Sequence, residues 1–168
     1  AIARLPGEAT GVALIMVDRE GRNQIAVASG ANARVDGAAV GGLEPEDVCL
    51  LGFEVPDAAV IAGARAAAAA GARIVLNPAP ARALAEQLRD ARAIATPNAD
   101  EARALGGPGA IAAHTGGPVI VTHGADGAVL HDGDTEARLP APEVEVVDTT
   151  GAGDAFNGVL AAGLAAGL

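Results

Sequence analysis

Residues 148–158 read DTTGAGDAFNG and connect a β-like run at 144–147 to an apolar, helix-like run at 155–168. Two glycines that flank an alanine in a strand-to-helix turn allow successive backbone N–H groups to point at one place. The positive end of the helix dipole lies at the same place and favours a bound anion such as a phosphoryl group. We therefore expect an anion site made by the backbone amides of Gly151, Ala152, Gly153 and Asp154.

Asp154 adds a carboxylate to the first turn of the expected helix. The helix dipole favours a negative charge there, and a carboxylate beside a phosphoryl group can accept the proton of a substrate hydroxyl. A glycine-rich turn with an acidic residue near a helix N-terminus is also a common structural cap. From these residues alone, the catalytic and the structural interpretations of Asp154 both stay open.

The composition excludes several other classes of protein. The chain has no lysine, so it has neither the Gly-Lys-Ser/Thr ending of a P-loop nor the β3 lysine of a protein kinase. Its one serine, Ser29, is not in a Gly-x-Ser-x-Gly sequence, which rules out a hydrolase elbow. A dinucleotide-binding oxidoreductase is disfavoured because Phe156 stands where the fingerprint needs a third glycine or alanine.

The charge and the cysteine content bound the partners and the setting. A net charge of −10 disfavours nucleic acid and anionic membranes as partners. No signal peptide or membrane span is recognisable, the lone Cys49 lies in an apolar run, and the three histidines lack metal-ligand spacing. These features favour a reduced, cytoplasmic setting.

Strand-like and helix-like segments alternate from residue 48 onward. Strands are expected at 48–53, 73–77, 93–95, 119–122 and 128–131, and helices from Pro56 to about Ala70, after Pro80 and from Asp100. This alternation predicts a parallel sheet with helices on both faces, a three-layer α/β/α core formed by residues 35–168. Two earlier β-like runs, 12–17 and 24–28, are joined by a charged turn at 18–23 and predict a separate edge hairpin within residues 1–34.

Polar residues stand at or just beyond the carboxyl ends of the expected strands. In parallel sheets ligands bind beyond these ends, so the polar residues are candidates for one shared site. Four unrelated loop-capping residues are the alternative interpretation. The residues are Asn77, Asn98, Thr122 and Asp148.

Segments spread along the chain resemble the ribokinase family of PfkB-type carbohydrate kinases. The run at 148–158 is similar to the C-terminal signature of that family. Further matches, in the family's order, are TGVALI (10–15), GANA (30–33), NPAPA (77–81), TPNADE (96–101) and VIVTHGADG (119–127). The matches cover nearly the full length, and the chain is identified as a member of this family.

The resemblance implies a ribokinase-like, Rossmann-like α/β sheet with a small β lid, formed by residues 1–34, that closes over a sugar. It implies ATP-dependent phosphorylation in which Asp154 is the catalytic base and the 151–154 turn is the anion hole. The lid strands would also form a homodimer. The nucleotide-facing residues would be Asn77, Asn98, Glu101, Thr122, Gly124, Asp126 and Gly127.

The resemblance also implies two metal ions. Magnesium would bridge the nucleotide phosphates and contact Glu101 through water, and potassium would bind Asp148 and the carbonyl of Thr150. The residues leave alternatives open. Asn98 and Glu101 have the spacing of a capping box, Gly124 and Gly127 suit a plain hairpin turn, and Asp148 suits a turn cap.

Glu54, at the end of the 48–53 strand, matches a family glutamate that contacts the sugar. The expected reaction is phosphorylation of the 5-hydroxyl of D-ribose, with fructose, a deoxy-sugar acid or a nucleoside as alternative acceptors. The family's N-terminal sugar-binding strand and C-terminal adenine-side segment have no counterpart, so we expect a fragment or part of a longer protein. A non-catalytic module that binds sugar or nucleotide is the alternative from another class.

Overall fold

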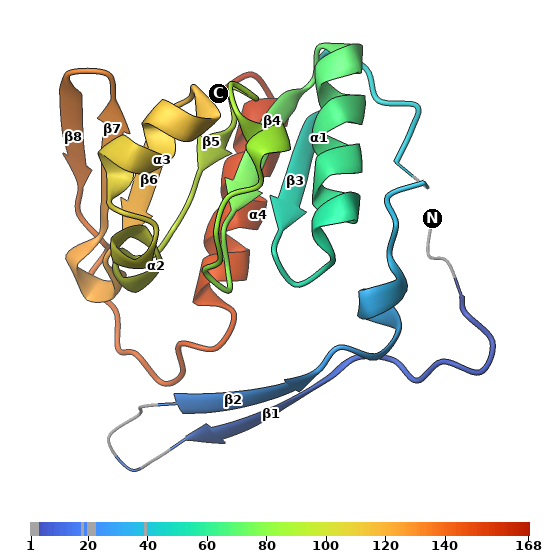
Figure 1. The fold of residues 1–168 in the computed structure, drawn as a ribbon. Helices are drawn as coiled ribbons and strands as arrows, with labels where there is room; N and C mark the ends of the chain where they lie inside the picture. The colour runs from blue at the N-terminus through green and yellow to red at the C-terminus, as the bar shows by residue number, and fades with distance from the viewer. Residues whose placement is uncertain (1–3, 18, 20–22, 39) are drawn as a thin grey trace.

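The computed structural model describes residues 4–17, 19, 23–38 and 40–168. They form a core around a six-stranded sheet with the strand order β3-β4-β5-β6-β7-β8 (Figure 1). The first four strands are parallel: β3 (Val48–Gly52), β4 (Arg73–Asn77), β5 (Ile94–Ala95) and β6 (Val119–Thr122). The last two pair antiparallel at one edge: β7 (Ala128–Asp132) and β8 (Thr135–Leu139).

Helices cover both faces of the parallel part of the sheet. They are α1 (Asp57–Ala70), α2 (Ala99–Ala104), α3 (Pro108–Thr115) and α4 (Ala152–Ala165). On β4, the alternate residues Ile74 and Leu76 pack in one cluster with α1, whereas Val75 between them is buried on the opposite face, where α4 lies. Figure 1 shows α4 passing behind the sheet from α1. The predicted α/β class with helices on two faces is confirmed.

Small residues let α1 pack closely on the sheet. The helix begins after Pro56 and ends at Gly71, whose φ of 73° is the left-handed conformation that favours glycine. A Cβ on Gly63 would lie 2.6 Å from Cδ2 of Leu51 in β3, so only glycine allows this approach without a shift. Ala64 and Ala67 complete the buried stripe, which explains why an alanine-rich segment folds against an aliphatic core.

The sheet is mixed, because β7 and β8 pair antiparallel at one edge of the predicted parallel sheet. The connection from β6 to β7, residues 123–127, is far shorter than the dozen or more residues that a parallel crossover needs, so the two strands must pair antiparallel. β8 was not expected, because its residues are exposed and its sequence, TEARL, lacks an apolar run. Pairing with β7, rather than burial, maintains this edge strand.

Two local predictions are wrong. The segment after Pro80 was predicted to be a helix, but its first regular element is one 3-10 turn at Glu86–Leu88. Residues before that turn stay irregular because Arg82 donates hydrogen bonds back to the loop after β3. The β-like run at 144–147 is not a strand: its valines are exposed and no strand lies beside it in the described residues. The helix predicted from residue 155 begins earlier, at Ala152.

The N-terminal hairpin stands apart from the six-stranded sheet. β1 (Val12–Val17) and β2 (Asn23–Ala28) pair antiparallel as a sheet of their own, and every residue of β1 is exposed. Figure 1 shows the hairpin on the side where β3 ends and α4 begins. The expected turn at 18–23 falls largely outside the described residues, and the division into a lid and a core stays a prediction. Within the described ranges no helix is long and apolar enough to cross a membrane.

Candidate active site

The N-terminus of α4 leaves backbone donors open. Gly151 is the N-cap and adopts a φ of 74°, a conformation that glycine reaches without strain. The N–H of Ala152 donates to the carbonyl of Thr149 over 3.1 Å. In the part of the chain that the structure describes, the N–H groups of Gly151, Gly153 and Asp154 have no acceptor. Three of the four amides of the predicted anion site are therefore available to a ligand.

Asp154 lies beside these amides and faces a cavity of about 450 Å³. Glu54, just after β3, and Asn77, the last residue of β4, line the same cavity. Three residues predicted from separate parts of the sequence are thus brought to one place. The remaining wall comes from Asn157 of α4, from apolar residues of β3, of α1 and of the loops after β3 and β4, and from Val35, Gly37 and Val40, which follow the hairpin.

A second cavity, of about 310 Å³, opens on the other side of the same turn. Thr122, Gly124 and Gly127, all predicted to face the nucleotide, line it together with Ala152 and Gly153. The rest of its wall is formed by Phe156, by Ala128 of β7 and by residues 139–142, which begin at the last residue of β8. The 151–154 turn therefore borders both cavities, Asp154 on one side and Ala152 and Gly153 on the other.

Asn157 holds the start of α4 in place. Its side chain, only 3% exposed, donates from Nδ2 to the carbonyl of Gly153 over 2.9 Å. Thr96, buried after β5, donates from Oγ1 to Asn157 Oδ1 over 2.6 Å. Neither residue was predicted from the sequence to have a role of its own. The available signal was a carboxamide one helical turn after Gly153, on the face of an otherwise apolar helix.

Asn98 and Glu101 form a complete capping box on α2. Asn98 Oδ1 accepts from the N–H of Glu101, and Glu101 Oε2 accepts from the N–H of Asn98, each over 2.8 Å. The capping box, which the sequence left open as an alternative, is therefore confirmed. A β-bridge joins Asn98 to Thr122, so the pair lies at the same edge of the sheet as the second cavity.

Asp148 forms a turn cap. Its Oδ1 accepts from the backbone N–H of Thr150 over 2.8 Å, and this bond lowers the pKa of the exposed Asp148 carboxyl. Asp148 does not follow a strand, because 144–147 is not one, so the strand-end argument for it was wrong. It lines neither cavity, and the same is true of Thr150, Asn98, Glu101 and the exposed Asp126.

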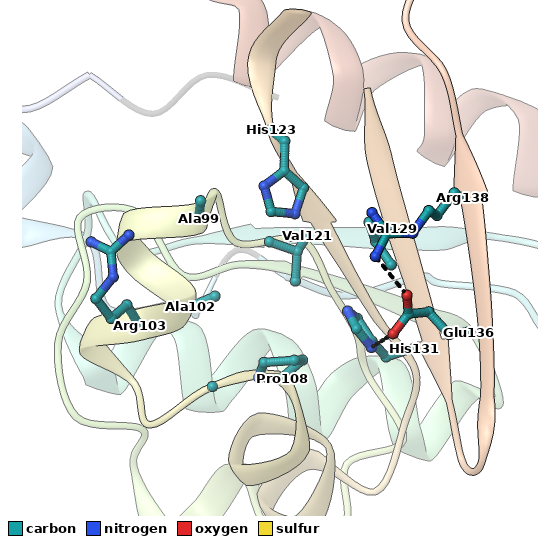
Figure 2. A pocket seen from close by; sticks show the side chains of 11 residues that line it. Ala99, Ala102, Arg103, Pro108, Val121, His123, Val129, His131, Glu136 and Arg138 are labelled. Carbon is teal, nitrogen blue, oxygen red and sulfur yellow. Dashed lines mark hydrogen bonds and ion pairs between the residues drawn. The ribbon is translucent and has the colours of Figure 1, made fainter. Parts of the chain in front are cut away.

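A third cavity, of about 390 Å³, lies away from this site, between α2 and the opposite face of β6, β7 and β8 (Figure 2). His131 and Glu136 approach each other at 3.8 Å, and Arg138 pairs with the same glutamate at 3.0 Å. These three side chains thus interact with one another, whereas Arg103, at the same cavity, pairs with Asp100 at 2.7 Å. No group of three or more His, Cys, Asp or Glu side chains suited to a metal ion occurs in the described ranges.

Comparison with known proteins gives a consistent result. Residues 2–168 match the pfkB family of carbohydrate kinases. A ribokinase of Lactococcus lactis is 34% identical over 168 residues, which cover 96% of this chain and 56% of that protein. The structure of ribokinase from Thermotoga maritima matches with a TM-score of 0.79 at 30% identity, over 95% of this chain and 58% of that one.

A further structure, the Arabidopsis thaliana ribokinase complexed with ribose and ATP, matches with a TM-score of 0.75 at 29% identity, over 96% of this chain and 58% of that one. The chain thus spans a little over half the length of these relatives. The shared architecture is the ribokinase-like α/β fold that the sequence motifs predict. With its matched residues running from 2 to 168, the chain belongs to the pfkB family of carbohydrate kinases.

Proposed function

We propose that this chain carries the catalytic turn, and parts of both substrate sites, of an ATP-dependent kinase that phosphorylates the 5-hydroxyl of D-ribose. The observation that carries the proposal is the position of the 151–154 turn between two cavities. One cavity would take the sugar and the other the nucleotide. Phosphoryl transfer depends mainly on alignment and on electrostatic stabilisation, and a turn shared by two cavities suits both.

In the proposed reaction, Asp154 accepts the proton of the sugar hydroxyl as the hydroxyl oxygen attacks the γ-phosphorus. The bond from that phosphorus to the bridging oxygen of ADP breaks, and ADP leaves with the electron pair. The open N–H groups of Gly151, Gly153 and Asp154 donate to the oxygens of the transferring group. Ala152 would join them only if its bond to Thr149 opened. Fixed donors of this kind typically contribute a few kcal/mol to the transition state.

The nucleotide would lie in the second cavity, against Thr122, Gly124 and Gly127. Asp126, in the 3-10 turn beside Gly124, adds to this nucleotide-facing set, whereas Asn77, predicted to face the nucleotide, lines the first cavity, which would take the sugar. Gly124 is exposed, and no atom lies within 4 Å of the position that a Cβ would take there, so phosphates or ribose can approach its backbone closely. The absence of lysine from the chain is compatible with this site, because backbone amides supply the donors.

Magnesium, when bound, would neutralise charge on the transferring phosphates. The described residues would supply only a small part of its ligands. Glu101 spends Oε2 on its capping box and would reach the metal through water, while the phosphates would supply most ligands. A potassium ion would be held beside the anion site by Asp148 and the carbonyl of Thr150, both of which offer hard oxygen donors.

D-ribose is proposed because ribokinases that are 34–36% identical align over most of this chain, and a further ribokinase that aligns with it was solved with ribose and ATP. Glu54 lines the same cavity as Asp154, so its carboxylate would accept hydrogen bonds from sugar hydroxyls.

Because ATP is the donor, we expect the protein to work in the cytoplasm. The exposed apolar strands β1 and β2 support a homodimer formed through the lid.

The test is ADP release by the natural full-length protein with magnesium and potassium, measured across D-ribose, fructose, a deoxy-sugar acid and adenosine. Turnover selective for D-ribose, with ribose 5-phosphate as the product, is the expected result. Turnover selective for another acceptor would replace ribose but keep the reaction class. ATP binding without turnover on any acceptor would contradict the kinase proposal and favour a binding module.

A further inference from the structure

Arg82 reaches from the segment after β4 to the loop that follows β3. Its Nη1 donates to the carbonyl of Phe53, and its Nη2 donates to the carbonyl of Val55 over 2.9 Å. Its Nε donates to Oδ1 of Asp57, at the start of α1, over 2.8 Å. The guanidinium carbon also lies 4.4 Å from the centroid of the Phe53 ring, which is a cation–π contact.

These contacts lie on both sides of Glu54 along the chain. The two carbonyls that accept from Arg82 belong to Phe53 and Val55, so the peptide group before Glu54 and the peptide group that joins Val55 to Pro56 are held. Phe53 is itself 3% exposed and donates from its N–H to the carbonyl of Ala79 over 3.1 Å. Glu54 is exposed and lines the cavity of Asp154, whereas Arg82 does not.

We propose that Arg82 is a positioning residue for the acceptor cavity. It holds the 53–55 loop so that the carboxylate of Glu54 is already oriented toward the sugar before the sugar binds. The inference rests on the proposed function, because it takes the cavity of Asp154 and Glu54 as the sugar site. Holding a binding group in advance removes the cost of ordering it when the ligand arrives.

Only an arginine can make this set of contacts. Its planar guanidinium presents donors in a fixed fork, and here the donors reach two carbonyls and one carboxylate while the flat face stacks on a ring. A lysine would keep the charge but would offer a single nitrogen, which cannot bridge both sides of Glu54 with the same geometry. Arg82→Lys therefore tests the fixed donor geometry of the guanidinium separately from its positive charge.

The test measures KM for D-ribose and for ATP in the natural full-length protein and in R82K, R82A and R89A. Arg89 is a matched control, because it also pairs with a carboxylate, that of Glu86, but touches neither cavity. We expect R82A to raise KM for ribose by about 10- to 100-fold and R82K by roughly a tenth to a half of that, since small misplacements of binding groups have effects of this order. KM for ATP should change by less than about twofold, and R89A should change neither constant.

Hydrogen exchange of the 53–57 backbone amides supplies a readout that does not depend on turnover. Faster exchange there in R82K, with unchanged exchange in β6 and β7, is the expected result. Either of two outcomes would overturn the inference: an unchanged ribose KM in folded R82K, or unchanged exchange at 53–57. If R82A does not fold, R82K alone decides. If the unaltered protein releases no ADP with any sugar, the proposed function fails, while the exchange result still reports whether Arg82 holds the loop.

Discussion

Helices α2 and α4 begin at the same end of the molecule, but the backbone N–H groups of their first turns are treated in opposite ways. At α2, the side chains of Asn98 and Glu101 each accept a hydrogen bond from the backbone N–H of the other residue, so the helix satisfies its own first donors. At α4, the N-cap is Gly151, which has no side chain to offer, and the N–H groups of Gly153 and Asp154 remain without an acceptor in the described residues.

This difference separates a helix end that serves stability from one that is available for a ligand. A side-chain cap typically contributes about 0.5–2 kcal/mol, and α4 lacks that contribution. In exchange, open amides and the positive end of the helix dipole face a turn that borders two cavities. Changes at the open end should mainly affect catalysis, and changes at the capped end should mainly affect stability.

The largest expected effect is at Asp154. Asp154→Asn removes the proposed base at the open end, so kcat should fall by about 10²- to 10⁴-fold, while KM for ATP should change little. ADP release with D-ribose measures both constants. Asp134→Asn, in the exposed turn between β7 and β8, is the matched control and should leave turnover unchanged. Near-normal turnover in D154N would remove Asp154 from the base role.

A smaller effect is expected where the open end is anchored. Asn157→Ala deletes the bond to the carbonyl of Gly153 and the bond from Thr96 Oγ1 at a buried site, and Thr96 Oγ1 keeps only its longer bond of 3.3 Å to the carbonyl of Leu76. The free energy of unfolding should fall by about 1–3 kcal/mol, and turnover should fall as well because the 151–154 turn loses its support. Urea denaturation checks the first expectation. Val159→Ala, on the exposed side of the same helix, should change stability by less than about 0.5 kcal/mol. If N157A is as stable as V159A, Asn157 is not an anchor.

The capped end should behave differently. Asn98→Ala removes the acceptor for the N–H of Glu101, so the free energy of unfolding should fall by about 1 kcal/mol. Glu101→Gln keeps an acceptor for the N–H of Asn98 and should retain most of the stability. Thermal unfolding of both variants measures this. A higher magnesium requirement in E101Q at unchanged stability would show that the carboxylate also serves the metal.

The smallest effect concerns Asp148. The bond from the N–H of Thr150 lowers the pKa of this carboxyl, so its stabilising contribution is present above the ordinary pKa of about 3.9 and is lost as the pH falls through the lowered value. Asp148→Asn keeps an oxygen acceptor that does not titrate in this range. Between pH 5 and 3, Tm should therefore decrease slightly more in the unaltered protein than in D148N. Parallel Tm curves would show that the turn is not held by the charge.

Sequence alone was sufficient for features with a local physical cause. Apolar runs bounded by Gly71 and by proline predicted β3, α1 and β4 within a residue or two, because helix and strand periodicity and helix stop signals act over short distances. The motif at 148–158 indicated a glycine-rich turn opening a helix, and α4 begins within it. The predictions at 144–147 and after Pro80 failed because strand pairing and the contacts of Arg82 are not local.

The site divides in the same way. The chemical identity of Asp154, the glycines and Glu54 was visible in the sequence, since residue type and motif spacing carry that information. Only the tertiary structure determined that Glu54, Asn77 and Asp154 face one cavity and that Thr122 shares another with Gly153. It also determined that Asn98 caps a helix and that Arg82 donates to the carbonyls of Phe53 and Val55, on both sides of Glu54. These relations depend on how β3, β4 and β6 are ordered in one sheet with α4 behind it, and contacts between residues so far apart in the chain exist only after the layers have packed.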